Sequence, residues 1–178
     1  MAKGEVTGFV DESIRGQRYL ISCVLIETRN LSDIRVRMKE IAGTGRRIHF
    51  HQESDRVRIQ ILDVISHLPI DAFVIEIQLR HGINVRMARE KCISFLVKHL
   101  QSNDLATRIV LEDFSDYQSD IRIIQSARSS AHRLAFEHRD GNSCPELWIA
   151  DAVVWTSGLS PKWKQRINPI VNTHFIIT

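Results

Sequence analysis

The segment ELWIADAVVW, residues 146 to 155, constrains the fold most, because its apolar side chains are too many for one helix face. We expect a helix that begins at Pro145 and Glu146 and ends near Gly158. A helix that is apolar on so many sides packs against a sheet. Asp151 stands in the middle of the apolar run, so its carboxylate points into the protein and needs a partner.

Three kinds of partner would satisfy the Asp151 carboxylate. The first is an internal salt bridge, or a hydrogen bond to the backbone or to a tryptophan, and the second is an arginine. The third is a divalent cation shared with other acids, because hard ions such as Mg²⁺ and Mn²⁺ take carboxylate oxygens as ligands. The residues alone leave these alternatives open.

The rest of the chain alternates between strand and helix patterns. Strands are expected at residues 5–11, 18–27, 71–80, 107–113 and 135–139, and the first two form a hairpin. Helices are expected at residues 31–43, at about 57–68, at 84–101 and at about 120–134, ahead of the helix that carries Asp151. This order predicts an α/β fold, a mixed β-sheet flanked by helices, as a single domain over residues 1–178.

Two of the expected strands end in acidic residues. Asp11 and Glu12 close the first strand, and Glu112 and Asp113 close the strand at 107–113. Functional sites in open sheets of this kind gather at the carboxyl ends of strands. Together with Asp151, these acids would supply the ligands of a two-metal site for phosphoryl transfer.

Composition limits the other function classes. The chain has 178 residues, 43% hydrophobic and 25% charged, as in soluble globular proteins, and its longest apolar runs are too short to cross a membrane. No targeting pattern opens the chain, so we expect a cytoplasmic protein. The three cysteines are too widely spaced to indicate a disulfide framework or a zinc site. A net charge of +3 is compatible with a polyanionic partner but does not require one.

Several motifs together resemble one known family. They are GFVDES, RRIHFHQESDRVRIQILDVI, RIVLED with the downstream Asp120, and PELWIADAVVW, and they span most of the chain in order. In combination they resemble the ribonuclease-H-like family known as domain of unknown function 3800. The resemblance implies a ribonuclease-H-like fold and a two-metal nuclease site that uses Mg²⁺ or Mn²⁺. It does not identify the substrate.

The resemblance also implies a set of catalytic and metal-binding acids: Asp11, Glu112, Asp120 and Asp151. Asp11 is expected to bridge both ions. An aspartate that enters a helix is also a common cap, so Asp120 has two interpretations. Glu12 ranks lower, because alternation along the strand turns it away from Asp11. Glu112 and Asp113 also point to opposite faces, and the resemblance favours Glu112, the acid directly after the VL pair, with Asp113 as the alternative.

The segment IHFHQES places His49 and His51 two residues apart. His49 matches the HF pair of the family, and the resemblance implies that it orients a phosphate or shuttles a proton, although a structural role is equally compatible. His51 has no counterpart in that pattern. An HxH pair can bind zinc, but no further ligands stand at a suitable spacing.

Basic residues in two stretches could hold a nucleic-acid backbone. They are Arg46 and Arg47 beside His49, and Lys162 and Lys164 in SPKWKQR, where Trp163 could stack on a base. We expect RNA or DNA as the partner. Two functions remain: a metal-dependent nuclease, or a ribonuclease-H-like module that binds nucleic acid or a protein without cutting. Only the nuclease requires the acids to converge.

Overall fold

The computed structural model describes residues 4–113, 117–129 and 134–178. These residues form a six-stranded sheet in the order β5-β4-β1-β2-β3-β6. The strands are β1 Val6–Arg15, β2 Arg18–Glu27, β3 Asp71–Gln78, β4 Arg108–Glu112, β5 Ala135–Arg139 and β6 Val171–Ile177. β2 is antiparallel to both β1 and β3, whereas the pairs β1–β4, β4–β5 and β3–β6 are parallel. The sheet is therefore mixed, as the sequence predicts.

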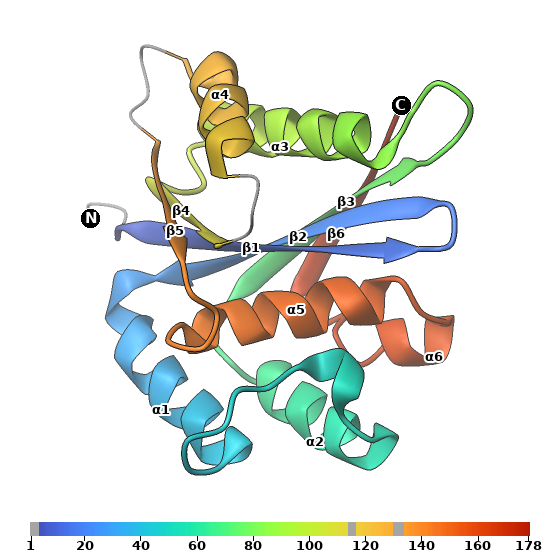
Figure 1. Cartoon of the computed structure of the whole chain (residues 1–178). Helices are drawn as coiled ribbons and strands as arrows, with labels where there is room; N and C mark the ends of the chain where they lie inside the picture. Colours follow the sequence, from blue (N-terminus) through green and yellow to red (C-terminus); the bar gives the residue numbers. More distant parts are fainter. Residues whose placement is uncertain (1–3, 114–116, 130–133) are drawn as a thin grey trace.

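Helices cover both faces of the sheet (Figure 1). They are α1 Leu31–Ala42, α2 Asp55–Ile65, α3 Val85–Ser102, α4 Tyr117–Ala127, α5 Pro145–Ser157 and α6 Pro161–Lys164, with short 3-10 turns η1 Thr28–Asn30 and η2 Phe50–Gln52. α3 and α4 lie on one face, and α5, α1, α2 and α6 lie on the other. None of the described helices combines the length and the apolar content that a membrane crossing would require.

Two apolar layers hold this single α/β domain together, one on each face of the sheet. The layer under α5 includes Phe9, Val24 and Val110, and the layer under α3 includes Val10, Ile21 and Leu111. Successive residues of β1 and β4 thus point to opposite layers, as strand geometry requires. α5 is buried almost throughout, because the sheet covers one side and α1 packs on another. Its apolar sequence is explained by this central position.

The expected elements differ from the observed ones at three places. β1 continues to Arg15, because antiparallel pairing with β2 extends to a two-residue turn in which Gly16 has φ of 59°. The helix expected from Asp120 to Leu134 begins earlier, at Tyr117, and ends at Ala127; residues 130–133 lie outside the described residues. β6 and α6 were not predicted. β6 begins with Val171, continues with the polar residues Asn172, Thr173 and His174, and pairs with the edge of β3.

Candidate functional site

The register between β1 and β4 determines which acids share a face. Val10 pairs with Leu111, and both side chains lie in the layer under α3. The next residue of each strand, Asp11 and Glu112, therefore points to the α5 face. Asp11 lies inside β1, not at its end as the sequence predicted, but it lies where β4 ends. Asp11 and Glu112 therefore meet at the carboxyl end of β4, although only Glu112 is the last residue of its strand.

Asp11 is a buried acid, with 8% of its surface exposed. Its Oδ1 accepts a 2.7 Å hydrogen bond from the backbone N–H of Glu12, and no described Lys, Arg or His forms an ion pair with it. Burial, and next the charge of Asp151, raise the pKa of Asp11 well above its ordinary value; Glu112 adds to the same effect. These acids from β1, β4 and α5 are therefore close enough to repel one another.

Asp151 projects from the middle of α5 and is partly buried. Its Oδ2 accepts a 3.0 Å hydrogen bond from the backbone N–H of Phe50, the residue between His49 and His51. Burial raises the pKa of Asp151, whereas this hydrogen bond and the nearby side chains of His51, Arg47 and His49 oppose the rise. The backbone N–H of Phe50 thus satisfies one hydrogen-bond acceptor of the Asp151 carboxylate, and the negative charge of this carboxylate is only partly compensated.

Glu112 differs from the other two acids because it has a cationic partner. Arg47 Nη2 donates to Glu112 Oε1 at 2.5 Å, and the two side chains are 16% and 11% exposed. Asp113, the lower-ranked alternative, is exposed just after β4. Of these two acids, only Glu112 lies on the same face of the sheet as Asp11.

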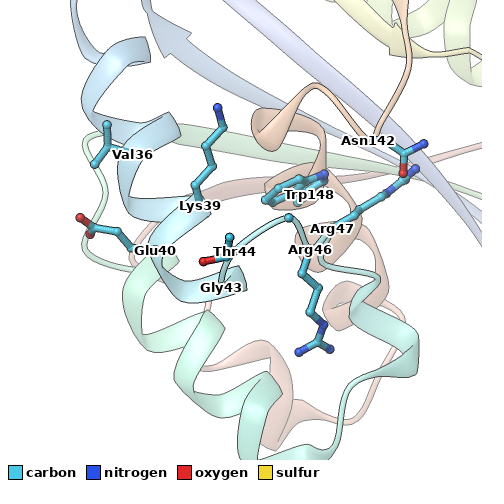
Figure 2. Close-up of a pocket in the computed structure, with 10 residues that line it drawn as sticks. Val36, Lys39, Glu40, Gly43, Thr44, Arg46, Arg47, Asn142 and Trp148 are labelled. Carbon is cyan, nitrogen blue, oxygen red and sulfur yellow. The ribbon is translucent and has the colours of Figure 1, made fainter.

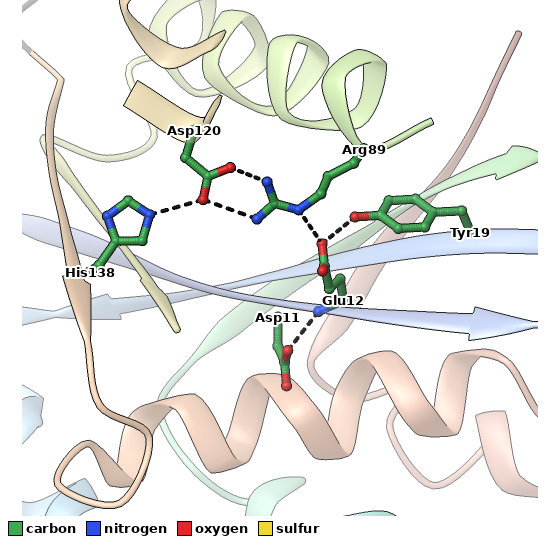
Figure 3. A network of polar contacts seen from close by, with 6 residues as sticks. All are labelled: Asp11, Glu12, Tyr19, Arg89, Asp120 and His138. Atoms are coloured by element: carbon green, nitrogen blue, oxygen red, sulfur yellow. Dashed lines mark hydrogen bonds and ion pairs between the residues drawn. The ribbon is translucent and has the colours of Figure 1, made fainter. Parts of the chain in front are cut away.

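Glu12 belongs to a second polar network, on the α3 face (Figure 3). Its carboxylate accepts a short hydrogen bond from the Tyr19 hydroxyl and one of 2.9 Å from Arg89 Nε. Arg89 also forms a bidentate pair with Asp120, and His138 Nε2 lies 2.9 Å from Asp120 Oδ2. Asp120, the expected fourth ligand, is therefore separated by the sheet from the Asp11 carboxylate and from α5, the helix that carries Asp151.

The histidines and the basic residues surround the α5 face at different depths. His49 is partly buried and His51 is exposed, with ring centroids 6.3 Å apart. Arg46 is exposed and pairs with Glu53 at 2.5 Å. Lys162 is exposed and Lys164 is partly buried on α6, which packs on α5. Trp163 is partly buried and packs edge-to-face with Trp155, with ring centroids 6.3 Å apart.

Sequence reasoning missed the partners of Glu12 and Asp120. Arg89, Tyr19 and His138 carry no local motif, and they meet only because α3, β2 and β5 converge on β1 and α4. It also missed that Glu146, in the first turn of α5, is fully buried and pairs with Arg35 at 2.5 Å. The apolar sequence around Glu146 was the available signal, since an acid there requires a partner.

Comparisons with known proteins identify the fold. No family model matches the chain, and no curated protein matches it in sequence. The structure of ribonuclease H2 from Pyrococcus horikoshii OT3 aligns with a TM-score of 0.58 and 16% identity, over 84% of this chain and 70% of that chain. The structure of Bst ribonuclease HIII in complex with Mn²⁺ aligns with a TM-score of 0.52 and 14% identity, over 85% of this chain and 51% of that chain. The fold is therefore ribonuclease-H-like.

Proposed function

We propose that this chain is a divalent-metal-dependent nuclease that hydrolyses phosphodiester bonds of RNA or DNA, with Asp11, Glu112 and Asp151 as the ligands of Mg²⁺ or Mn²⁺. One observation carries the proposal. Asp11 and Asp151 come from different elements, lie close together in a buried setting, and both have a raised pKa without an ion-pair partner among the described residues. Placing uncompensated carboxylates together costs stability, and functional sites are a common reason for such an arrangement.

The residues fit a hard cation in chemistry and charge. Carboxylate oxygens are the ligands that Mg²⁺ and Mn²⁺ prefer, and a cation would supply the positive charge that Asp11 and Asp151 lack. Among the described residues, no three His, Cys, Asp or Glu side chains are already arranged to hold an ion. Glu112, which would be the third ligand, is engaged by Arg47. Bound ions would supply activation of water and stabilisation of the leaving oxygen.

The chain's own residues would position the substrate. Arg46, Arg47, Lys162 and Lys164 would contact phosphates, and His49, beside Asp151, would orient a phosphate or move a proton. Both similar structures are named as ribonucleases, and one was determined with Mn²⁺, which supports this assignment. Phosphoryl transfer depends mainly on such positioning and on charge stabilisation.

A second candidate function is a ribonuclease-H-like module that binds nucleic acid or a protein without cutting. The Arg47–Glu112 ion pair favours it, because it neutralises Glu112 without a metal. Asp120 points the same way, since Arg89 and His138 already satisfy it. With this function the basic residues would bind the nucleic acid or protein partner, and Asp11 and Asp151 would not be needed for that binding.

The deciding experiment measures degradation of labelled single-stranded RNA, single-stranded DNA and RNA–DNA hybrid by purified protein with Mg²⁺ or Mn²⁺. Asp11→Asn and Asp151→Asn should each lower the rate by at least about a hundredfold, because each removes a metal ligand. Asp33→Asn, an exposed acid on α1, is the matched control and should retain the wild-type rate. If folded wild-type protein cuts none of the substrates, the binding module is the better account.

A further inference from the structure

Arg47 lies at the boundary between the acidic site and a large cavity. Its guanidinium pairs with Glu112, and the same side chain lines a cavity of about 830 Å³ between α1 and the start of α5. Figure 2 shows Arg47 extending past Trp148 toward Asn142, while Arg46 points in another direction from the same loop. One side chain therefore connects an acid of the site with a space large enough for a ligand group.

The Arg47–Glu112 pair is enclosed by the loop before α5. Trp148 Nε1 donates a 2.6 Å hydrogen bond to the carbonyl oxygen of Gly141 and holds this loop in place. A Cβ at Gly141 would lie 2.5 Å from Arg47 Cζ and still closer to Glu112 Oε1. Because the backbone passes directly over the ion pair, a larger residue here would push aside the ends of the Arg47 and Glu112 side chains. The loop therefore encloses the pair, and the two side-chain ends remain able to move.

The enclosed position leaves Arg47 only partly satisfied. Its Nε is buried and has no hydrogen-bond partner among the described residues. A guanidinium can donate five hydrogen bonds, and an unsatisfied buried donor costs free energy. Arg47 also opposes the rise in the pKa of Asp151, so its charge acts on the acidic site beyond Glu112. Arg47 therefore provides positive charge to the carboxylates at the expense of its own hydrogen bonding.

The cavity beside Arg47 suits an anionic group. Its lining includes Lys39, Arg46 and Arg47 against one acid, Glu40. Lys39 forms no ion pair among the described residues, so its charge is available to a ligand. A guanidinium binds a phosphate through two parallel hydrogen bonds, which would satisfy donors that Glu112 leaves unused. A phosphate of a nucleic-acid strand has the charge and the geometry for this cavity.

We propose that Arg47 is an exchangeable counter-ion. Without a divalent cation it neutralises Glu112, and once a cation is bound by the carboxylates it turns into the cavity and contacts a substrate phosphate. This inference rests on the proposed function, because it assumes that Asp11, Glu112 and Asp151 bind the cation. Arg47 would compete with the metal ion for Glu112 and would help to bind the nucleic acid. Removing its charge should therefore raise the affinity for the metal ion and lower the affinity for nucleic acid.

The test uses the full chain and two ligands measured separately. Mn²⁺ affinity is measured by isothermal titration calorimetry, and affinity for a labelled phosphorothioate oligonucleotide, which resists hydrolysis, is measured by fluorescence anisotropy with saturating Mn²⁺. Arg47→Gln should bind Mn²⁺ on the order of tenfold more tightly, because Glu112 loses its competing partner. The same variant should bind the oligonucleotide on the order of tenfold more weakly.

Two variants control for charge and for folding. Arg46→Gln removes the same charge from the same loop, but Arg46 pairs with Glu53, so Mn²⁺ affinity should not change. Arg47→Lys keeps the charge and should leave Mn²⁺ affinity within about twofold of wild type. Circular dichroism and thermal unfolding establish that each variant is folded.

The outcomes separate this inference from the proposed function. Unchanged or weaker Mn²⁺ binding by folded Arg47→Gln would overturn the counter-ion role, even if wild type binds Mn²⁺ and Asp11→Asn does not. Tighter Mn²⁺ binding with unchanged oligonucleotide affinity would overturn the phosphate contact. Absence of Mn²⁺ binding by both wild type and Arg47→Gln would overturn the proposed function and this inference together.

Discussion

The backbone N–H of Phe50 donates a 3.0 Å hydrogen bond to Oδ2 of Asp151, across a sequence separation of 101 residues. This contact brings the loop that carries Arg46, Arg47, His49 and His51 onto the middle of α5. The loop is therefore held on the acidic face of the sheet by this hydrogen bond together with the buried side chains of Ile48 and Phe50.

Removing the Asp11 carboxylate should stabilise the metal-free protein. The pKa of Asp11 is raised in the folded state, so the folded protein holds this proton more tightly than the unfolded chain does. The stability that Asp11 contributes is complete at acid pH and is lost as the pH rises through its folded pKa. At neutral pH, Asp11→Asn should gain on the order of 1 kcal/mol, or roughly 2–4 °C in Tm.

Thermal unfolding in EDTA between about pH 4 and pH 8 measures this effect. The Tm difference between Asp11→Asn and wild type should widen as the pH rises, whereas Asp33→Asn should show no such trend. A difference that stays constant over this range, or a less stable Asp11→Asn at pH 8, contradicts the raised pKa of Asp11.

A side chain at Gly141 should separate Arg47 from Glu112. Gly141→Ala places a methyl group 2.5 Å from Arg47 Cζ, so the pair or the loop must move. We expect a loss of about 1–3 kcal/mol in the free energy of unfolding, measured by urea denaturation. In the double variant Gly141→Ala with Arg47→Ala, part of this loss should disappear, because the two sites are in contact. If the losses of the two single variants simply add in the double variant, the contact between the new methyl group and Arg47 is not the cause of the loss at Gly141.

Arg89 should be essential for stability, although it lies away from the proposed metal ligands. Arg89→Ala leaves the Asp120 side chain, which is 2% exposed, and Glu12 without their cation. The free energy of unfolding should fall by about 3–5 kcal/mol, as for other buried pairs that lose one partner. Arg86→Ala, at an exposed position on the same helix, should change it by less than about 0.5 kcal/mol. Equal effects of the two substitutions would rule out the network as the cause.

Lys162 and Lys164 should contribute to nucleic-acid binding through charge alone. Replacing either one by alanine should weaken binding of a single-stranded oligonucleotide and reduce the slope of log K against log salt by about 0.7 for each phosphate that the variant no longer neutralises. Lys98→Ala on α3, on the opposite face of the sheet, serves as the control. Anisotropy titrations over a range of KCl concentrations measure the slope. An unchanged slope for Lys162→Ala and Lys164→Ala would remove α6 from the binding surface.

Local pattern predicted most of the fold. The apolar run around Asp151 predicted the central helix, and β-branched residues predicted β1, β2, β3 and β4. The fold class was confirmed by the ribonuclease-H-like neighbours. The family assignment received no match from any family model and stays a resemblance. β6 was missed although its sequence VNTHFII is rich in residues that favour strands, so the local pattern was an available signal for it.

The candidate site was predictable in composition but not in arrangement. Alternation along the strand predicts that Asp11 and Glu12 point to opposite faces, and the Val10–Leu111 pairing places Glu112 on the same face as Asp11. The Arg47–Glu112 pair and the cluster around Arg89 join residues far apart in sequence. Such contacts depend on register and packing, so a single sequence does not reveal them.

The two-residue hairpin turn and the β1–β4 register have a further consequence for how this sequence can change. The turn fixes how Asp11 and Glu12 pair with β2, and neighbouring residues of β1 point to opposite faces. One residue inserted or deleted between Glu12 and the turn would therefore exchange Asp11 and Glu12 between the α5 face and the Arg89 network. A change of two residues would restore both, so related sequences should vary in length between Ser13 and Arg15 only by even numbers of residues.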